Sequence, residues 1–217
     1  MQSMRVYTLT CTWAESYGAV LQAYALAKAI EDLGFEAQII NYQPSYDLIR
    51  RSRRALRPIY RPKFMDFLRD SGLLTKSRYR DLRELKAADL SADAIVVGSD
   101  QVWNCDKYFN GKDDAMFLEF ARTRTRRVSY AASLSMSEVP ADQVARYKRL
   151  LDRFDAISVR EATGARALSK LGIEDAQVMV DPVYLLDKEQ WGRLASNGKK
   201  DFTKEKYALV VCLEQRD

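Results

Sequence analysis

The chain has 217 residues, of which 47% are hydrophobic and 30% are charged, so its composition is that of a globular protein and excludes a disordered one. It contains no histidine, which excludes a Ser-His-Asp triad, a Cys-His pair and a histidine-ligated metal built from this chain alone. No apolar run approaches the ~18 residues of a membrane span, and the N-terminus shows no signal-peptide pattern. Cys11, Cys105 and Cys212 have no CxxC spacing, so we expect reduced thiols in a cytoplasmic protein.

The net charge of +5 comes from one segment. Arg50–Lys63 carries seven cationic residues and no acidic residue, so the rest of the chain is slightly acidic. Three interpretations remain open: a solvated loop, a surface for anionic lipid headgroups or an anionic substrate, and a nucleic-acid site. Tyr60 is the only aromatic residue among these cations and no nucleic-acid motif is present, so we expect no nucleic acid as a partner. A lipid surface would place the protein peripherally at the inner face of the cell membrane.

A strand-helix-strand unit is predicted at the start of the chain. Residues 5–11 (RVYTLTC) alternate as a strand does, and residues 36–41 form a second strand. Between them, residues 17–33 carry apolar side chains at helical spacing, with Ser16 as the N-cap and Gly34 in the C-terminal turn. The two strands should therefore be parallel, with a right-handed crossover.

Strands and helices alternate along the rest of the chain. After an irregular, arginine-rich segment at 42–62, we expect helices over 64–74, 78–88, 142–154, 161–171 and 187–195, a helical turn over 117–121, and strands over 93–98, 126–132, 156–159 and 177–180. This order predicts an α/β fold with a doubly wound, mostly parallel Rossmann-like sheet over residues 1–195. The polar stretch 196–206 is a predicted linker, and 207–217 is predicted to open a truncated second domain with a strand over 207–213.

Candidate site residues follow the strands, because ligands in open α/β sheets bind beyond the carboxyl ends of the strands. After the first strand, TWAESYGA (12–19) leads into a helix N-terminus, where free N–H groups and the helix dipole favour an anion. Ser16 supplies a hydroxyl there and Gly18 permits close approach, although a plain N-cap is an equal interpretation. No GxGxxG pattern is present, so a dinucleotide fingerprint is not supported.

The densest polar cluster is SDQVWN (99–104), which follows the strand at 93–98. Asp100 can orient or deprotonate a hydroxyl, and Trp103 can stack on a sugar face. The alternative is a turn-forming loop with Trp103 in the core. Ser133 and Arg160-Glu161 follow the strands at 126–132 and 156–159. Arg160 can hold an anion bidentately or pair with a neighbouring acid.

Five segments, taken in order, resemble the bacterial polysaccharide pyruvyl transferase family. They are SYGAVLQAYAL (16–26), VVGSDQVWN (96–104), VSYAAS (128–133), ISVRE (157–161) and VDPVYLL (180–186), and Trp191 also fits. The resemblance covers roughly residues 5–195. It implies two Rossmann-like halves facing across a cleft, as in the GT-B-like architecture of two-domain glycosyltransferases, with this chain as the N-terminal half.

The resemblance also implies an activity. Members transfer the enolpyruvyl group of phosphoenolpyruvate onto two hydroxyls of a sugar, which makes a pyruvate ketal on a lipid-linked saccharide or a precursor of exopolysaccharide or cell wall. No cofactor and no metal are implied. An arginine and a histidine in the second half of members take part, so we expect this chain to be inactive alone. Asp100 matches the catalytic carboxylate, and the implied substrate-binding residues are Ser16, Tyr17, Gly18, Ser99, Gln101, Trp103, Asn104, Ser133 and Arg160.

Two departures from the family pattern concern the donor site. Trp13-Ala14-Glu15 stands where many members have glycine or asparagine, and a carboxylate at position 15 would repel a phosphate. Leu134 stands where glycine usually follows the YAAS segment. Both departures count against the first loop as the site that holds the donor. Two alternatives to the pyruvyl transferase also stay open: a sugar-nucleotide glycosyltransferase of similar fold, and a non-catalytic module that binds polyanions or a protein partner.

Overall fold

The computed structural model describes residues 3–14, 16–44, 61–105 and 110–196. The chain divides into two compact units, Met1–Leu185 and Leu186–Asp217. In the second unit the described element is helix α7, Lys188–Ser196, which lies where a helix was predicted. Its start is closed by two reciprocal hydrogen bonds, from Gln190 N to Asp187 Oδ1 (2.7 Å) and from Asp187 N to Gln190 Oε1 (2.9 Å). The predicted linker and the strand at 207–213 lie outside the described residues, so that domain division stays a prediction.

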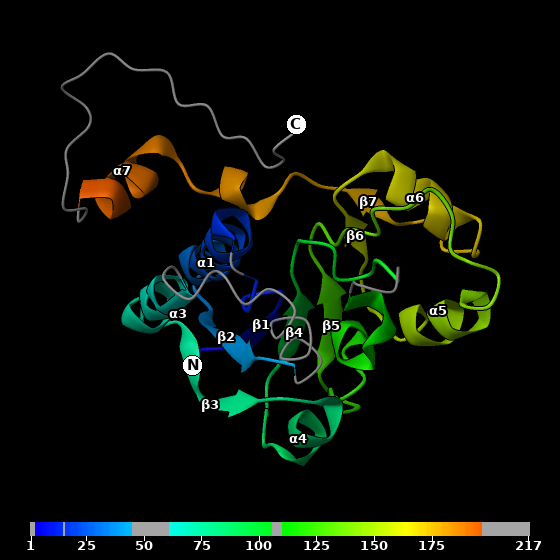
Figure 1. Cartoon of the computed structure of the whole chain (residues 1–217), viewed down its shortest axis with the longest axis horizontal. Helices are drawn as coiled ribbons and strands as arrows, with labels where there is room; N and C mark the ends of the chain where they lie inside the picture. Colours follow the sequence, from blue (N-terminus) through cyan, green and yellow to red (C-terminus); the bar gives the residue numbers. More distant parts are fainter. Residues whose placement is uncertain (1–2, 15, 45–60, 106–109, 197–217) are drawn as a thin grey trace, which may run out of the picture. The chain divides into compact units, whose positions relative to one another are not determined.

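The first unit is built on a parallel sheet (Figure 1). Five strands pair in the order β3-β2-β1-β4-β5. Parallel bridges Val128↔Ala156 and Ala132↔Val159 continue the pairing to a two-stranded sheet of β6 and β7. The predicted α/β fold with a mostly parallel Rossmann-like sheet is confirmed. The strands are β1 (Arg5–Leu9), β2 (Glu36–Tyr42), β3 (Leu74–Tyr79), β4 (Ala94–Val97), β5 (Arg126–Ser129), β6 (Ser158–Val159) and β7 (Gln177–Val178).

Alternate residues of the central strands face two separate hydrophobic clusters. Tyr7 and Leu9 of β1 point to one face, and Val6 points to the other. Helices α1 and α3 supply the second face, whereas α4, α5, α6 and the 3₁₀ helix η2 supply the first. The helices are α1 (Tyr17–Asp32), α3 (Arg61–Asp70), α4 (Leu82–Ala87), α5 (Val144–Leu151) and α6 (Ala162–Ser169), with 3₁₀ helices η1 (Asn110–Lys112), η2 (Asp114–Phe117) and η3 (Pro182–Leu185).

Helix α1 begins where it was predicted to begin and ends one residue earlier. Gly34 has φ +89°, which is the left-handed conformation expected after a helix C-terminus. Ser16 has the extended backbone of an N-cap, but its hydroxyl makes no capping hydrogen bond.

Strand β3 was missed, and this is the largest error of the sequence-based prediction. The helices expected over 64–74 and 78–88 are shorter, and LTKSRY (74–79) between them pairs with β2. This strand lies at the edge of the five-stranded sheet, and only Thr75 in it is buried. Its charged residues face solvent, so it lacks the apolar pattern that marks an interior strand.

Several predicted strands end early at their carboxyl ends. The strand predicted over 126–132 stops at Ser129, and Ala131 has φ +50°. The strand predicted over 93–98 stops at Val97, three residues before Asp100 with φ +88°. Non-glycine residues with positive φ interrupt a strand, and no period-2 pattern reveals them. The helical turn predicted over 117–121 lies earlier, at Asp114–Phe117, because Leu118 also has a left-handed backbone (φ 55°).

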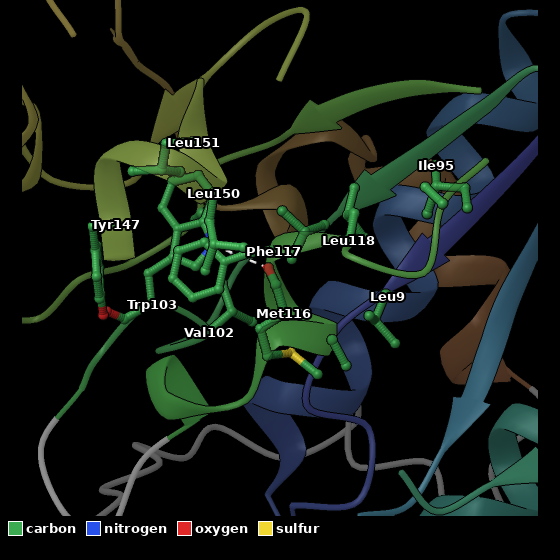
Figure 2. Packing of buried hydrophobic residues seen from close by; sticks show 14 of the residues in the cluster. Leu9, Ile95, Val102, Trp103, Met116, Phe117, Leu118, Tyr147, Leu150 and Leu151 are labelled. Atoms are coloured by element: carbon green, nitrogen blue, oxygen red, sulfur yellow. Dashed lines mark hydrogen bonds between the residues drawn. The ribbon is translucent and has the colours of Figure 1, made fainter. Parts of the chain in front are cut away.

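Trp103 lies at the centre of one hydrophobic cluster (Figure 2). Its ring is fully buried, stacks on Phe117 at a centroid distance of 5.8 Å, and meets Phe154 edge-on at 5.6 Å. The indole N–H donates to the Met116 carbonyl at 3.0 Å, and the Tyr147 hydroxyl donates to the Trp103 carbonyl at 2.6 Å. The sugar-stacking role predicted for Trp103 is therefore wrong, because neither face of the ring is open to a ligand.

Truncation of Trp103 tests this assignment. We expect Trp103→Ala to lower the free energy of unfolding by about 3–5 kcal/mol, because it leaves a cavity and removes the partner of the Met116 carbonyl. Tyr184→Ala removes a side chain that is 77% exposed and should change that free energy by less than about 0.5 kcal/mol. Urea denaturation followed by circular dichroism measures both. Equal losses in the two variants would contradict a core role for Trp103.

Candidate functional site

The candidate site lies where the carboxyl ends of several parallel strands meet. β1 pairs with β2 on one side and with β4 on the other, so chain order reverses between β1 and β4. In doubly wound sheets this switch point is where ligands bind. The side chains found at this edge follow β4, β5, β6 and β7: Ser99 and Asp100, Ser133, Arg160 and Glu161, and Asp181.

The loop after β4 is held tightly against β1 and α1. Thr10 donates its hydroxyl proton to the Ser99 carbonyl at 2.5 Å, and the Gln22 side-chain amide donates to Thr10 Oγ1 at 2.9 Å. A Cβ at Gly98 would lie 3.1 Å from Leu26 Cδ2 and 3.2 Å from Thr10 Cβ. Any larger residue before Ser99 would therefore require the Leu26 and Thr10 side chains to shift by a few tenths of an ångström.

Asp100 adopts a backbone conformation that is unusual for its residue type. With φ +88° it lies in the left-handed region, which costs of order 1–3 kcal/mol and persists only where the surrounding contacts enforce it. Here the Asp100 carbonyl accepts a hydrogen bond from Ser133 N at 2.9 Å, and Asp100 forms a parallel bridge with Ala132. Its carboxylate Oδ1 accepts the Gln101 N–H at 2.7 Å. The fold thus fixes this carboxyl group at the end of β4.

Arg160 comes from the end of β6 and reaches the loops after β4 and β7. Its Nη1 donates to Asp181 Oδ2 at 3.1 Å and to Ser99 Oγ at 3.3 Å. Ser99 in turn donates its hydroxyl proton to Asp181 Oδ2 at 3.1 Å. A second carboxylate oxygen, Glu161 Oε2, lies 3.9 Å from Arg160 Nε. The pairing with a neighbouring acid that the sequence left open is thus present, and Arg160 and Ser99 are brought together.

The electrostatics of Asp100 follow from its position. Burial raises the pKa of its carboxyl group above the usual value, and the Asp181 charge acts in the same direction. The Gln101 N–H and the Arg160 cation lower this pKa, but the net direction is upward. A half-buried carboxyl group with a raised pKa holds its proton to higher pH, so Asp100 is suited to exchange a proton with a substrate.

Ser133 is tied to Glu161 by a convergent set of hydrogen bonds. The Ser133 hydroxyl (2.8 Å), Leu134 N (3.0 Å) and Ser135 N (2.9 Å) all donate to Glu161 Oε1. Leu134, which departs from the family pattern, is fully buried in the core. Glu161 therefore fixes the turn after β5, and the Ser133 hydroxyl is engaged by this carboxylate.

Of the other predicted site residues, Gln101 and Trp103 contact this cluster through backbone N–H groups, which donate to Asp100 Oδ1 (2.7 Å) and to the Ser133 carbonyl (3.1 Å). Ser16, Tyr17 and Gly18 lie exposed at the start of α1, and the Tyr17 ring meets Phe64 edge-on at 4.9 Å. The Asn104 side-chain amide donates to Gln101 Oε1 at 2.9 Å, so these two residues support the loop. Glu15 lies outside the described residues.

Sequence reasoning missed two residues of the cluster. Asp181 accepts hydrogen bonds from both Ser99 and Arg160, and Glu161 organises the turn that carries Ser133. The signal for Asp181 was available, since an acidic residue directly before Pro182 ends the strand predicted over 177–180. Glu161 was noted only as the neighbour of Arg160, because a side chain that reaches back 28 residues leaves no local pattern.

Asp100→Asn tests the electrostatics of this loop. Because the pKa of Asp100 is raised in the folded state, ionisation of Asp100 destabilises the fold as pH rises through the folded pKa. The neutral amide escapes this cost, keeps an acceptor for the Gln101 N–H and tolerates positive φ. We therefore expect Asp100→Asn to be at least as stable as the wild type at pH 8, and to lose that advantage toward pH 4. Urea unfolding at both pH values measures this, and a variant that is less stable at pH 8 would contradict it.

The full sequence of the chain was compared with known protein families, curated proteins and solved structures. The family described as polysaccharide pyruvyl transferase matches residues 17–216. No curated protein and no solved structure matches the chain. Among the described residues there is no cluster of acidic or cysteine side chains that could hold a metal ion, and no helix long and apolar enough to cross a bilayer. Because the family match covers most of the sequence and includes the loops after β4, β5, β6 and β7, the chain belongs to the polysaccharide pyruvyl transferase family.

Proposed function

We propose that the protein takes part in the transfer of the enolpyruvyl group of phosphoenolpyruvate to a sugar of a polysaccharide or lipid-linked saccharide, which forms a pyruvate ketal. The observation that carries this proposal is that a cation and a half-buried carboxyl group lie at the same edge of the sheet, at the carboxyl ends of its strands. Arg160 lies hydrogen-bonded to Ser99, and Asp100 follows Ser99 directly in the same loop. The family to which the chain belongs supports a polysaccharide acceptor.

The reaction defines what the site must supply. One sugar hydroxyl adds to C2 of the enol, its proton is lost to a base, and C3 gains a proton to become a methyl group. The bond from C2 to the phosphate oxygen then breaks, the second hydroxyl adds to C2, and inorganic phosphate leaves with the remaining proton. No electron is gained or lost overall, so the proposed reaction uses phosphoenolpyruvate as a donor substrate and needs no redox cofactor.

Arg160 is the proposed grip for an anionic group of the donor. A guanidinium presents five N–H donors in a plane and binds carboxylate or phosphate bidentately. Nη1 is the atom used by Asp181 and Ser99. Among the described residues no hydrogen bond joins Nη2 or Nε, and the side chain is 34% exposed. Nη1 is therefore fixed by the fold, Nε faces Glu161 Oε2 at 3.9 Å, and Nη2 remains available to an anion.

Asp100 is the proposed acid-base group. Its raised pKa lets it hold a proton to higher pH than an ordinary aspartate does, and a proton must be delivered to C3 or removed from a sugar hydroxyl in this reaction. Such a group placed within hydrogen-bond reach contributes typically 10²–10⁴-fold in rate. In a catalytically competent form of the enzyme, Asp100→Asn would lower kcat by about that factor.

A ligand screen tests the proposed donor against the glycosyltransferase alternative, because the switch point of a doubly wound sheet also suits nucleotides. We expect phosphoenolpyruvate to raise the Tm of the chain in a saturable way, and a panel of nucleotide sugars to leave it unchanged. Arg160→Gln should weaken the phosphoenolpyruvate effect about tenfold or more, since a charge-assisted bidentate contact is lost. Stabilisation by nucleotide sugars, with none by phosphoenolpyruvate, would favour the glycosyltransferase instead.

Contact with an anionic membrane is proposed for the basic segment Arg50–Lys63, most of which lies outside the described residues. Each cation near such a surface contributes about 1 kcal/mol. We expect replacement of Arg50, Arg51, Arg53 and Arg54 by glutamine to release the protein from vesicles that contain phosphatidylserine and to leave phosphoenolpyruvate binding unchanged. Vesicle co-sedimentation measures this, with neutral vesicles as the control. Equal sedimentation before and after replacement would assign the segment to a solvated loop.

A further inference from the structure

Asp181 links the ends of three strands although no role was expected for it. Its Oδ2 accepts hydrogen bonds from the Ser99 hydroxyl after β4 and from Arg160 Nη1 after β6. Its own position is set by η3, because Oδ1 accepts the Val183 N–H at 3.1 Å and the Asp181 carbonyl accepts the Tyr184 N–H at 3.0 Å. There is thus a division of roles between the two carboxylate oxygens. Oδ1 anchors Asp181 to its own turn, whereas Oδ2 contacts the loops after β4 and β6.

This division has a consequence for the guanidinium. Arginine side chains lose rotamer entropy when they are fixed on a ligand, so a guanidinium that is already held in place loses less. Asp181 Oδ2 holds Arg160 by Nη1 before any ligand arrives, and leaves Nη2 and Nε without a hydrogen bond among the described residues. The side chain of Asp181 is itself 21% exposed, so this contact is partly shielded from water.

We propose that Asp181 is a positioning residue, which fixes Arg160 and Ser99 so that Nη2 of the guanidinium is presented to an anionic substrate. The identity of that anion, phosphoenolpyruvate, rests on the proposed function. The positioning itself does not, because it concerns the unliganded side chain of Arg160.

The charged groups around Asp181 make its effect on anion binding distinctive. Asp100, Glu161 and Tyr130 are the other titratable groups that face this cluster with Arg160. The charge of Asp181 raises the pKa of both Asp100 and Tyr130, so the same carboxylate also favours the proton on Asp100. By Coulomb interaction alone, a negative charge beside Arg160 weakens anion binding. Removal of the Asp181 charge should therefore tighten anion binding if Coulomb repulsion alone matters, and should weaken anion binding if Asp181 positions Arg160. The sign of the change in affinity distinguishes these two roles.

The experiment uses Asp181→Asn in the 217-residue chain. Asparagine is isosteric and can keep the Val183 N–H bond through Oδ1, but it presents an amide NH₂ group to Arg160 in place of an acceptor. Calorimetric titration with inorganic phosphate and with phosphoenolpyruvate measures binding. The matched control is Asp175→Asn, which removes one negative charge from an exposed residue that forms no hydrogen bond or ion pair among the described residues.

We expect Asp181→Asn to weaken binding of both anions about tenfold or more, because a small misplacement of a binding group has a large effect. Asp175→Asn should leave both affinities unchanged. In an Arg160→Gln background, Asp181→Asn should have no further effect. Unchanged or tighter binding by Asp181→Asn, or additive losses in the double variant, would overturn the proposal.

Two further measurements keep the result clear. If Asp181→Asn fails to fold, Ser99→Ala replaces it, because it removes a hydrogen bond from the Asp181 network without changing any charge; weaker phosphate binding supports positioning, and unchanged binding contradicts it. If the wild type binds neither anion, the proposed function fails, and NMR of the arginine side chains still tests the positioning. Slowly exchanging Arg160 N–H signals that Asp181→Asn abolishes support it, whereas signals that are already averaged in the wild type overturn it.

Discussion

The site depends on hydrogen bonds that the segment after β5 makes on both of its edges. Ser133 N donates to the Asp100 carbonyl, and the Ala132 carbonyl accepts the Arg160 N–H. Residues 130–133 therefore hold the loop after β4 and the loop after β6 at fixed distances from one another. The parallel sheet provides this segment because β5 lies between β4 and the bridge to β6. Without these two backbone contacts, the side chains of Asp100 and Arg160 would belong to independent loops.

The charges at this edge form a compact group in which carboxyl groups outnumber the cation. Arg160 contacts Asp181 and Glu161, and Asp100 is a further carboxyl group whose pKa is raised by burial and by the Asp181 charge. Each acid has a separate structural partner: Asp181 is fixed by its own turn, Glu161 by the Ser133–Ser135 turn, and Asp100 by Gln101 N. The cation consequently has acids on two sides, at Nη1 and at Nε, and only Nη2 has no partner among the described residues.

The sequence predicted the class of fold, the order of the strands that lead into the site, and the positions of Ser99, Asp100 and Arg160 at strand ends. Those features follow from apolar periodicity and from the rule that parallel strands end at one edge. Three things could not be read from it. Strand β3 is an edge strand with charged residues and no core pattern. The left-handed conformations of Asp100 and Ala131 arise from long-range contacts. The carboxylate of Asp181 meets Ser99 across 82 residues of chain. Trp103 was wrongly placed for a related reason, since tertiary packing alone decides whether an indole in a polar loop faces ligand or core.

The burial of Trp103 has a consequence for the thermodynamics of ligand binding. The indole is the far end of the same short loop that carries Ser99 and Asp100, and it is clamped in the core by Phe117 and by the Met116 carbonyl. The conformational entropy of this loop is thus given up when the protein folds and not when a ligand arrives. Preorganisation of this kind improves affinity without adding a contact. Ligand association at this edge should accordingly show a small unfavourable configurational entropy and little change in amide exchange within residues 99–104.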